Sequence, residues 1–242
     1  MANLTKTIQQ QIQGIPEDTS FGYGELTIPA QQYPSAAKVL ERLQQKGLIR
    51  KLSKGIFYKP KTTVFGEKRP GEEQVLKPYL YREGQRIAYI TGTYLYNQMG
   101  LTTQVPAIIQ IASRERRIFV NRGTVHATAV KSYVDITEDN YRLLELLDAL
   151  KDLKDIPDVN MQAAIGIIKS QIQQLTESRL KEIVGYALIY PPRVRALLGA
   201  VLSSEGMTDI AKALKESLNP LTVFKLGIKD TLLPLAAQWN IQ

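Results

Sequence analysis

The chain has no cysteine and a single histidine, His126, among its 242 residues. The absence of cysteine excludes disulfides, thiolate nucleophiles and cysteine-ligated zinc, and one imidazole alone does not make a zinc site. A Ser-His-Asp triad would have to use His126, which lies in a strand-like run, residues 124–128, where a structural role is the simpler interpretation. We therefore expect no catalytic residue, no metal and no cofactor, and we do not expect an enzyme.

Long apolar runs are also missing. The first residues, MANLTKTIQQQIQGIP, lack the apolar segment of a signal peptide. The longest apolar stretches, such as residues 163–168 with Gly166 inside, fall far short of the ~20 residues that a membrane helix needs. The sequence predicts a cytoplasmic protein with no membrane partner.

Positive charge is concentrated at the N-terminus. Residues 1–70 contain eleven Lys and Arg against five Asp and Glu, so +6 of the formal net charge of +8 lies in this part. A basic module attached to a nearly neutral body favours a polyanionic partner. The alternative is that the surface lysines only maintain solubility.

The N-terminal pattern predicts a winged helix-turn-helix. Turn and helix-stop residues separate a first helix, a brief second element, a third helix and a short hairpin: residues 5–12, 25–28, 34–46 and 48–59. In this fold the third helix enters the major groove and the hairpin lies along flanking phosphates. We expect residues 1–70 to form this DNA-binding domain.

The third predicted helix has two distinct faces. At about 100° per residue, its apolar residues fall on one side: Ala36, Val39, Leu40 and Leu43. Polar residues occupy the other side, and together with the hairpin lysines and two residues before the helix they form the expected DNA-binding set: Gln32, Tyr33, Ser35, Lys38, Arg42, Lys51, Lys54 and Lys59. An alternative is a protein-interaction module whose basic hairpin docks on an acidic partner.

The remainder of the chain predicts an α+β fold. Residues 60–71 resemble a linker, with Val64 and Phe65 expected to hold it against a surface. A middle α+β section, residues 71–135, mixes short helices and strands, with Thr91 expected to cap one helix. From residue 136 to 242 the apolar period is helical, which predicts a mainly helical section.

Two arginines near the start of a predicted helix stand out. Pro191 and Pro192 favour a helix start, and cations in its first turn oppose the helix dipole. Arg193 and Arg195 therefore either form an internal ion pair with a neighbouring helix or bind a partner. We interpret the nearby carboxylates as a solvated helix end rather than a Mg²⁺ site: Asp152, Asp155 and Asp158.

Several segments resemble the AbiEi-like antitoxins of bacterial toxin-antitoxin systems, which are associated with abortive phage infection. They are KGLIRKLSKGIFYKPKTTVFGE (46–67), AYITGTYLYNQMGLTTQVPAIIQIA (88–112), YPPRVRALLGAVL (190–202) and LNPLTVFKLG (218–227). The likeness covers nearly the whole chain, and its most specific parts are residues 100–106 and the hairpin with Lys-Gly-Ile-Phe-Tyr.

The resemblance implies a function. Such proteins carry a winged helix-turn-helix that represses transcription of their own operon by binding its operator DNA. Their C-terminal region counteracts a nucleotidyltransferase-like toxin, with or without a stable complex. We expect the same two roles here, with residues 136–242 as the antitoxin section.

Overall fold

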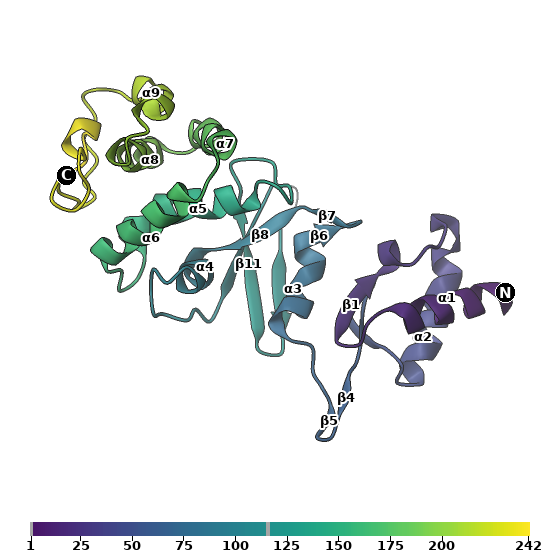
Figure 1. Ribbon diagram of the computed structural model, residues 1–242. Helices are drawn as coiled ribbons and strands as arrows, with labels where there is room; N and C mark the ends of the chain where they lie inside the picture. Colours follow the sequence, from purple (N-terminus) through teal and green to yellow (C-terminus); the bar gives the residue numbers. More distant parts are fainter. Residues whose placement is uncertain (1, 115–116) are drawn as a thin grey trace. The chain divides into compact units, whose positions relative to one another are not determined.

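The computed structural model describes residues 2–114 and 117–242 and contains two compact units (Figure 1). Unit 1 comprises Met1–Ile87 and Asn121–Val125, and unit 2 comprises Ala88–Val120 and His126–Gln242. The predicted α+β class and the helical C-terminal region are confirmed. The division into three sections at residues 70 and 135 stays a prediction.

Unit 1 begins with two helices and a three-stranded antiparallel sheet whose strand order is β1-β3-β2. Their bounds are α1 (Ala2–Gly14), β1 (Thr19–Gly22), the 3-10 turns η1 (Tyr23–Glu25) and η2 (Ala30–Gln32), α2 (Tyr33–Gln45), β2 (Arg50–Ser53) and β3 (Ile56–Lys59). Both long helices, the hairpin and their order match the sequence prediction. Strand β1 was not predicted, and the short helical element expected at residues 25–28 is replaced by an irregular segment, residues 26–29, with a 3-10 turn on either side of it in the chain. Leu26 and Ile28 nevertheless anchor this segment in the core.

A second hairpin follows, where the sequence predicts a linker. It consists of β4 (Thr62–Thr63) and β5 (Gly66–Glu67), joined by Val64 and Phe65. The expectation that these two side chains hold the segment against a surface is wrong, because they are 94% and 98% exposed. Unit 1 then continues with α3 (Glu72–Leu80), β6 (Tyr81–Arg82) and β7 (Gln85–Arg86).

The residues after Ile87 form a mixed sheet, order β10-β11-β9-β8, most of which belongs to unit 2. Its elements are β8 (Ala88–Thr91), α4 (Gly92–Gln98), β9 (Ile109–Ser113), β10 (Phe119–Arg122) and β11 (Val125–Lys131). Strands β8 and β9 are antiparallel, whereas β9 and β11 are parallel. Thr91 does not cap α4 with its side chain, because its hydroxyl bonds to a carboxylate of a later helix.

The helical part of unit 2 packs into one large core (Figure 1). Its elements are α5 (Tyr141–Asp152), η3 (Leu153–Asp155), α6 (Met161–Gln173), α7 (Glu177–Ala187), α8 (Pro192–Ser204), α9 (Thr208–Glu216) and η4 (Ala237–Trp239). Asn160 and Thr176 cap α6 and α7 by accepting backbone N–H bonds. In the part of the chain that the structure describes, no helix combines the length and the apolar character of a membrane crossing.

Candidate nucleic-acid interface

Helix α2 buries one face and exposes the other, as its periodicity predicts. The apolar residues Ala36, Val39, Leu40 and Leu43 are buried in the core of unit 1. Ser35, Lys38 and Arg42 lie on the exposed face, and within the described residues neither cation has a carboxylate at ion-pair distance. The exposed side of α2 therefore presents a hydroxyl, two cations without an ion-pair partner and the carboxylate of Glu41 to solvent.

The two residues expected to flank this face differ in exposure. Gln32 is exposed in η2, directly before the helix. Tyr33 is half-buried, and the centroid of its ring lies 4.9 Å from that of Tyr23. Tyr33 therefore packs within unit 1 as much as it faces solvent.

The β2–β3 hairpin is the hairpin that the sequence predicts to be a wing, and the name is kept for it below. Lys51 and Lys54 are exposed, and Gly55 makes the turn with φ +76°. A Cβ at Gly55 would lie 3.6 Å from Cδ2 of Tyr23. Because Tyr23 also contacts Tyr33 in the first turn of α2, the wing turn and the start of α2 lie at the same end of unit 1.

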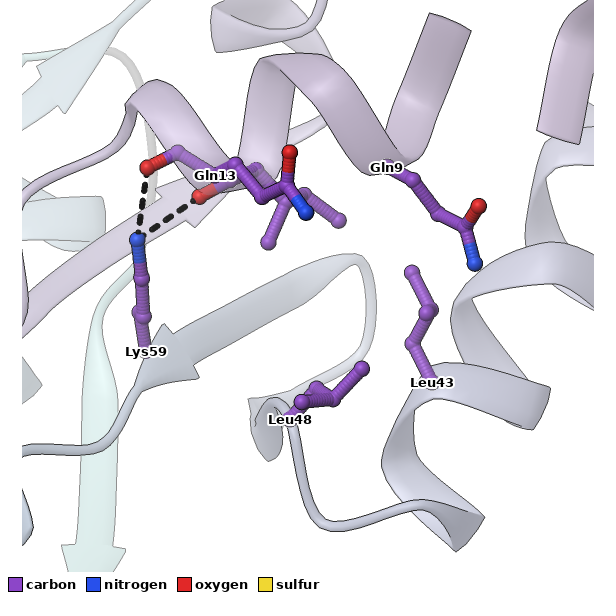
Figure 2. A pocket seen from close by; sticks show the side chains of 6 residues that line it. Gln9, Gln13, Leu43, Leu48 and Lys59 are labelled. Carbon is purple, nitrogen blue, oxygen red and sulfur yellow. Dashed lines mark hydrogen bonds between the residues drawn. The ribbon is translucent and has the colours of Figure 1, made fainter. Parts of the chain in front are cut away.

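Lys59 has a different role from the one expected. Its ammonium donates to the backbone carbonyls of Ile12 and Gln13, at 3.0 and 2.9 Å (Figure 2). It also donates to the carbonyl of Ile15, at 2.5 Å. These carbonyls lie at the C-terminal end of α1, where a cation compensates the helix dipole. We therefore remove Lys59 from the DNA-contact set.

A pocket of about 200 Å³ lies beside Lys59, between α1 and the end of α2 (Figure 2). Apolar side chains and two glutamines line it: Gln9, Ile12, Gln13, Leu43 and Leu48. Because the ammonium of Lys59 is already bound by three carbonyls, the pocket offers no free charge to an anionic ligand.

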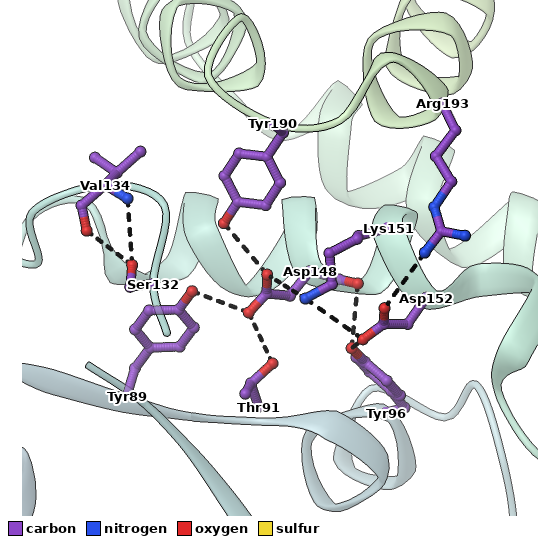
Figure 3. A network of polar contacts seen from close by, with 10 residues as sticks. All are labelled: Tyr89, Thr91, Tyr96, Ser132, Val134, Asp148, Lys151, Asp152, Tyr190 and Arg193. Carbon is purple, nitrogen blue, oxygen red and sulfur yellow. Dashed lines mark hydrogen bonds and ion pairs between the residues drawn. The ribbon is translucent and has the colours of Figure 1, made fainter. Parts of the chain in front are cut away.

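A buried polar cluster in unit 2 was not predicted. It centres on Asp148 in α5, which is only 3% exposed (Figure 3). One carboxylate oxygen, Oδ2, accepts bonds from the hydroxyls of Tyr89 and Thr91 in β8, at 2.9 and 2.8 Å. The other, Oδ1, accepts from the Tyr190 hydroxyl at 3.3 Å and pairs with Lys151 Nζ at 3.2 Å. Asp148 thus joins the sheet, its own helix and the connection between α7 and α8.

The electrostatics of this cluster favour a structural role. Burial, followed by the nearby carboxylate charge, raises the pKa of Tyr89 and Tyr190 far above that of free tyrosine, so both hydroxyls remain donors. Burial acts to lower the pKa of Lys151, but Asp148 and Asp152 outweigh it and raise the pKa, which keeps the ammonium charged. The cluster therefore satisfies its own charges and hydrogen bonds.

The two arginines singled out in the sequence are engaged within unit 2. Nη2 of Arg193 lies 3.9 Å from Oδ1 of Asp152, and its Nη1 lies 3.7 Å from Oδ2 of Asp155. Of the two alternatives given for this residue, an internal ion pair or a partner contact, these distances match the internal ion pair. Arg195 donates to the Ser217 carbonyl at 3.0 Å, at the C-terminal end of α9. Both guanidinium groups thus have partners inside unit 2, although Nε of Arg195 is buried without a hydrogen-bond partner among the described residues. Partner binding by these two arginines stays a prediction.

The remaining candidate ligands do not assemble into a metal site. Asp152 and Asp155 face Arg193, and Asp158 accepts a bond from the Gln104 side chain. His126 is exposed in β11. Among the residues described, no group of three or more His, Cys, Asp or Glu side chains could hold a metal ion.

Comparison with known proteins finds a family and a similar solved structure. The model of a family described as "Family of unknown function (DUF6088)" matches residues 23–184, more than half of the chain. The chain is also similar to the crystal structure of the RV2827C protein from Mycobacterium tuberculosis, with 11% sequence identity and a TM-score of 0.49, covering 92% of this chain and 84% of that one. No curated protein matches at the significance threshold.

Proposed function

We propose that this chain, which belongs to the DUF6088 family of unknown function, binds duplex DNA through unit 1, acting as a winged helix-turn-helix. Helix α2 enters the major groove and the β2–β3 wing lies against flanking phosphates. The observation that carries the proposal is the exposed face of α2, on which Lys38 and Arg42 lie one turn apart, and in the described part of the chain neither has a carboxylate within ion-pair distance.

The position of the wing supports one continuous contact surface. Tyr23 contacts both the wing turn at Gly55 and the first turn of α2. A recognition helix reads bases mainly with its N-terminal part, and the wing lies beside that end of α2, which carries Ser35, whereas Arg42 lies in the last turn of the helix. The cations of the wing, Lys51 and Lys54, can therefore reach phosphates next to the bases that α2 reads.

Each side chain has a defined role in this proposal. Arg42 is long and forked, and can donate two bonds to O6 and N7 of a guanine. Lys38, Lys51 and Lys54 act as point charges on phosphates. Ser35 and Gln32 add short polar contacts to bases or backbone at the start of α2.

A broader role follows from the resemblance of residues 46–67 and 88–112 to the AbiEi-like antitoxins. On that basis the DNA is the operator of the protein's own operon, and the helical part of unit 2 counteracts a nucleotidyltransferase-like toxin in the cytoplasm. The protein is then a transcriptional autorepressor and antitoxin rather than an enzyme. The alternative is that the basic wing docks on an acidic protein or on the toxin itself, without specific DNA binding.

The DNA-binding proposal is tested with a duplex selected from a random-sequence library by the full-length chain. We expect the Lys38→Ala, Arg42→Ala double variant to lose specific binding, by about 1–3 kcal/mol for each base contact removed. The matched control is Lys225→Ala, Lys229→Ala, which removes the same charge from exposed positions in unit 2. Fluorescence anisotropy measures the affinity of each variant.

Specific and non-specific effects separate clearly in this experiment. Reduced affinity in the α2 variant alone supports the recognition-helix assignment. Equal losses in both double variants would mean that only total charge matters, and wild-type affinity in the α2 variant would refute the proposal. Expression of the α2 variant from an independent promoter, together with the nucleotidyltransferase-like toxin that the proposal implies, tests whether protection from the toxin survives the loss of repression.

A further inference from the structure

The turn of the β4–β5 hairpin exposes two apolar side chains almost completely. Val64 is 94% exposed and Phe65 is 98% exposed. A two-residue hairpin turn usually carries Asn, Asp or Gly, and nothing in the local geometry requires large apolar residues there. Figure 1 shows the hairpin projecting as a narrow finger from unit 1.

The base of this hairpin is held firmly. The guanidinium of Arg50 in β2 donates two bonds to the carboxylate of Glu67 in β5, at 2.9 and 2.6 Å. On the other side, the Lys68 ammonium bonds to Asp18, which also accepts from the Tyr58 hydroxyl at 2.6 Å. Side chains from three parts of unit 1 thus fix the direction in which the turn points.

The hairpin base adjoins the C-terminal end of α2. A Cβ at Gly47, which ends this helix, would lie 3.6 Å from Nη1 of Arg50, the residue that holds Glu67. The β2–β3 wing adjoins the opposite end of α2 through Tyr23. Helix α2 therefore has one hairpin at each end, just as a major groove has a minor groove on each side.

We infer that the β4–β5 hairpin is a wedge that inserts Phe65, supported by Val64, into the DNA minor groove beside the site bound by α2. This inference rests on the proposed DNA binding and adds a second contact that bends the duplex. Apolar wedges of this kind enter between base steps, unstack them partly and kink the helix toward the major groove.

The dimensions of the hairpin suit this role. Val64 lies three residue steps beyond the base at Lys61, which gives a reach of about 10 Å at ~3.3 Å per residue. The minor groove is about 7.5 Å deep and ~6 Å wide. The turn can thus reach the floor of the groove, while the paired strands, about 4.8 Å apart, require the groove to open.

The charge around the wedge favours DNA over an apolar protein surface. Lys61 and Arg69 flank the hairpin and are exposed, and in the described residues neither has an ion-pair partner. The carboxylates nearest the base, Glu67 and Asp18, are already paired with cations. An apolar tip with free cations at its base matches bases enclosed by two rows of phosphates.

The test uses the full-length chain and the library-selected duplex, with 2-aminopurine placed at successive steps on both sides of the α2 site. Wild type is expected to increase 2-aminopurine fluorescence at one flanking step and to bend the duplex, measured by energy transfer between end labels. Phe65→Ala should abolish both signals and weaken binding on the order of 10-fold. Phe65→Leu keeps an apolar wedge and should retain most of the bend.

The matched control is Leu221→Ala, at an apolar side chain that is 88% exposed in unit 2. It should leave affinity, bend and fluorescence unchanged. Phe65→Ala with a wild-type bend and fluorescence would overturn the wedge while leaving DNA binding by α2 intact. Conversion of a wild-type dimer to a monomer by Phe65→Ala, measured by light scattering without DNA, would also overturn it, because the turn would then contact a second copy of the chain. Wild-type affinity in the Lys38→Ala, Arg42→Ala variant would instead refute the proposed function itself.

Discussion

Gly199 and Trp239 form a close contact that makes unit 2 sensitive to one methyl group. Gly199 lies inside α8, and a Cβ built there would lie 2.2 Å from both Cη2 and Cζ3 of the indole ring. Carbon atoms pack at about 3.5–4.0 Å, so Gly199→Ala requires a displacement of more than about 1 Å. The ring is only 5% exposed, and the Phe224 bridge to Ile241 holds its segment in place.

The cost of this substitution follows from two opposing effects. Overpacking of a core costs about 1–3 kcal/mol, while replacing a helical glycine by alanine gains up to ~1 kcal/mol. We expect the free energy of unfolding to fall by about 1–2 kcal/mol if the ring shifts within its site. Expulsion of the ring would bring the loss to the ~3–5 kcal/mol typical of a deleted tryptophan.

The fluorescence of Trp239, the sole tryptophan of the chain, reports directly on this contact. Urea unfolding of Gly199→Ala should show a lower midpoint, with a red-shifted emission of the folded state if the ring becomes exposed. Gly166→Ala in α6 is the matched control, because its new Cβ meets nothing within 4 Å; it should gain about 0.5–1 kcal/mol. Equal stability of both variants, with unchanged emission, would refute the packing explanation.

Two further predictions concern charged groups. Asp148→Ala is expected to lower the free energy of unfolding by about 3–5 kcal/mol, because it leaves the Lys151 ammonium and three hydroxyls without their buried carboxylate. Urea unfolding measures this loss, with Asp155→Ala, at a side chain that is 66% exposed, as the control; equal midpoints of the two variants would contradict the prediction. The hydrogen bond from Lys68 is the main cause that lowers the pKa of Asp18 below the usual value of 3.8. The ionised Asp18 therefore contributes fully to the stability of the fold above pH 3.8, and this contribution is lost as the pH falls through the folded-state pKa. The stability difference between wild type and Asp18→Asn should therefore shrink below pH 3.8, and a difference that widens on acidification would argue against it.

The elements that the sequence predicts best are those in which apolar residues recur at a regular helical spacing. The face of α2 with Val39 and Leu43 could be assigned because helical spacing alone separates it from Lys38 and Arg42. The neighbouring β1 is four residues long, and its pairing with β3 is a long-range contact without a local signal. Short strands and 3-10 turns of this kind depend on tertiary packing rather than on local sequence.

The buried cluster around Asp148 could have been found from one further observation. Asp148 follows Leu144 by four residues and so lies on the same face of α5 as a fully buried leucine. A carboxylate in that position needs a partner, and Lys151 is three residues further along the same helix. The hydroxyls of Tyr89 and Thr91 could not have been predicted, because only the packing of β8 against α5 brings them to the carboxylate.

Lys59 shows why a count of cations overstates a DNA-binding surface. Residues 1–70 contain eleven cations and five carboxylates, a net charge of +6. The structure pairs Arg50 with Glu67 and Lys68 with Asp18, and it binds Lys59 to the end of α1. Pairing removes charges of both signs equally, so the long-range attraction for DNA is unchanged while the number of cations able to contact phosphates falls.

A salt titration measures the number of cations that contact phosphates, as distinct from the net charge of the protein. Four proposed contacts, on α2 and the wing, give a slope of log K against log salt concentration of about −3.6, whereas six neutralised phosphates would give about −5.4. Lys61 and Arg69 add two contacts if the hairpin wedge is engaged, so wild type should approach the steeper value. Phe65→Ala should return the slope toward the shallower one without any change in net charge. A slope of about −3.6 in both proteins would show that the hairpin cations do not reach the DNA, and a slope of about −5.4 in both would show that they reach it without Phe65.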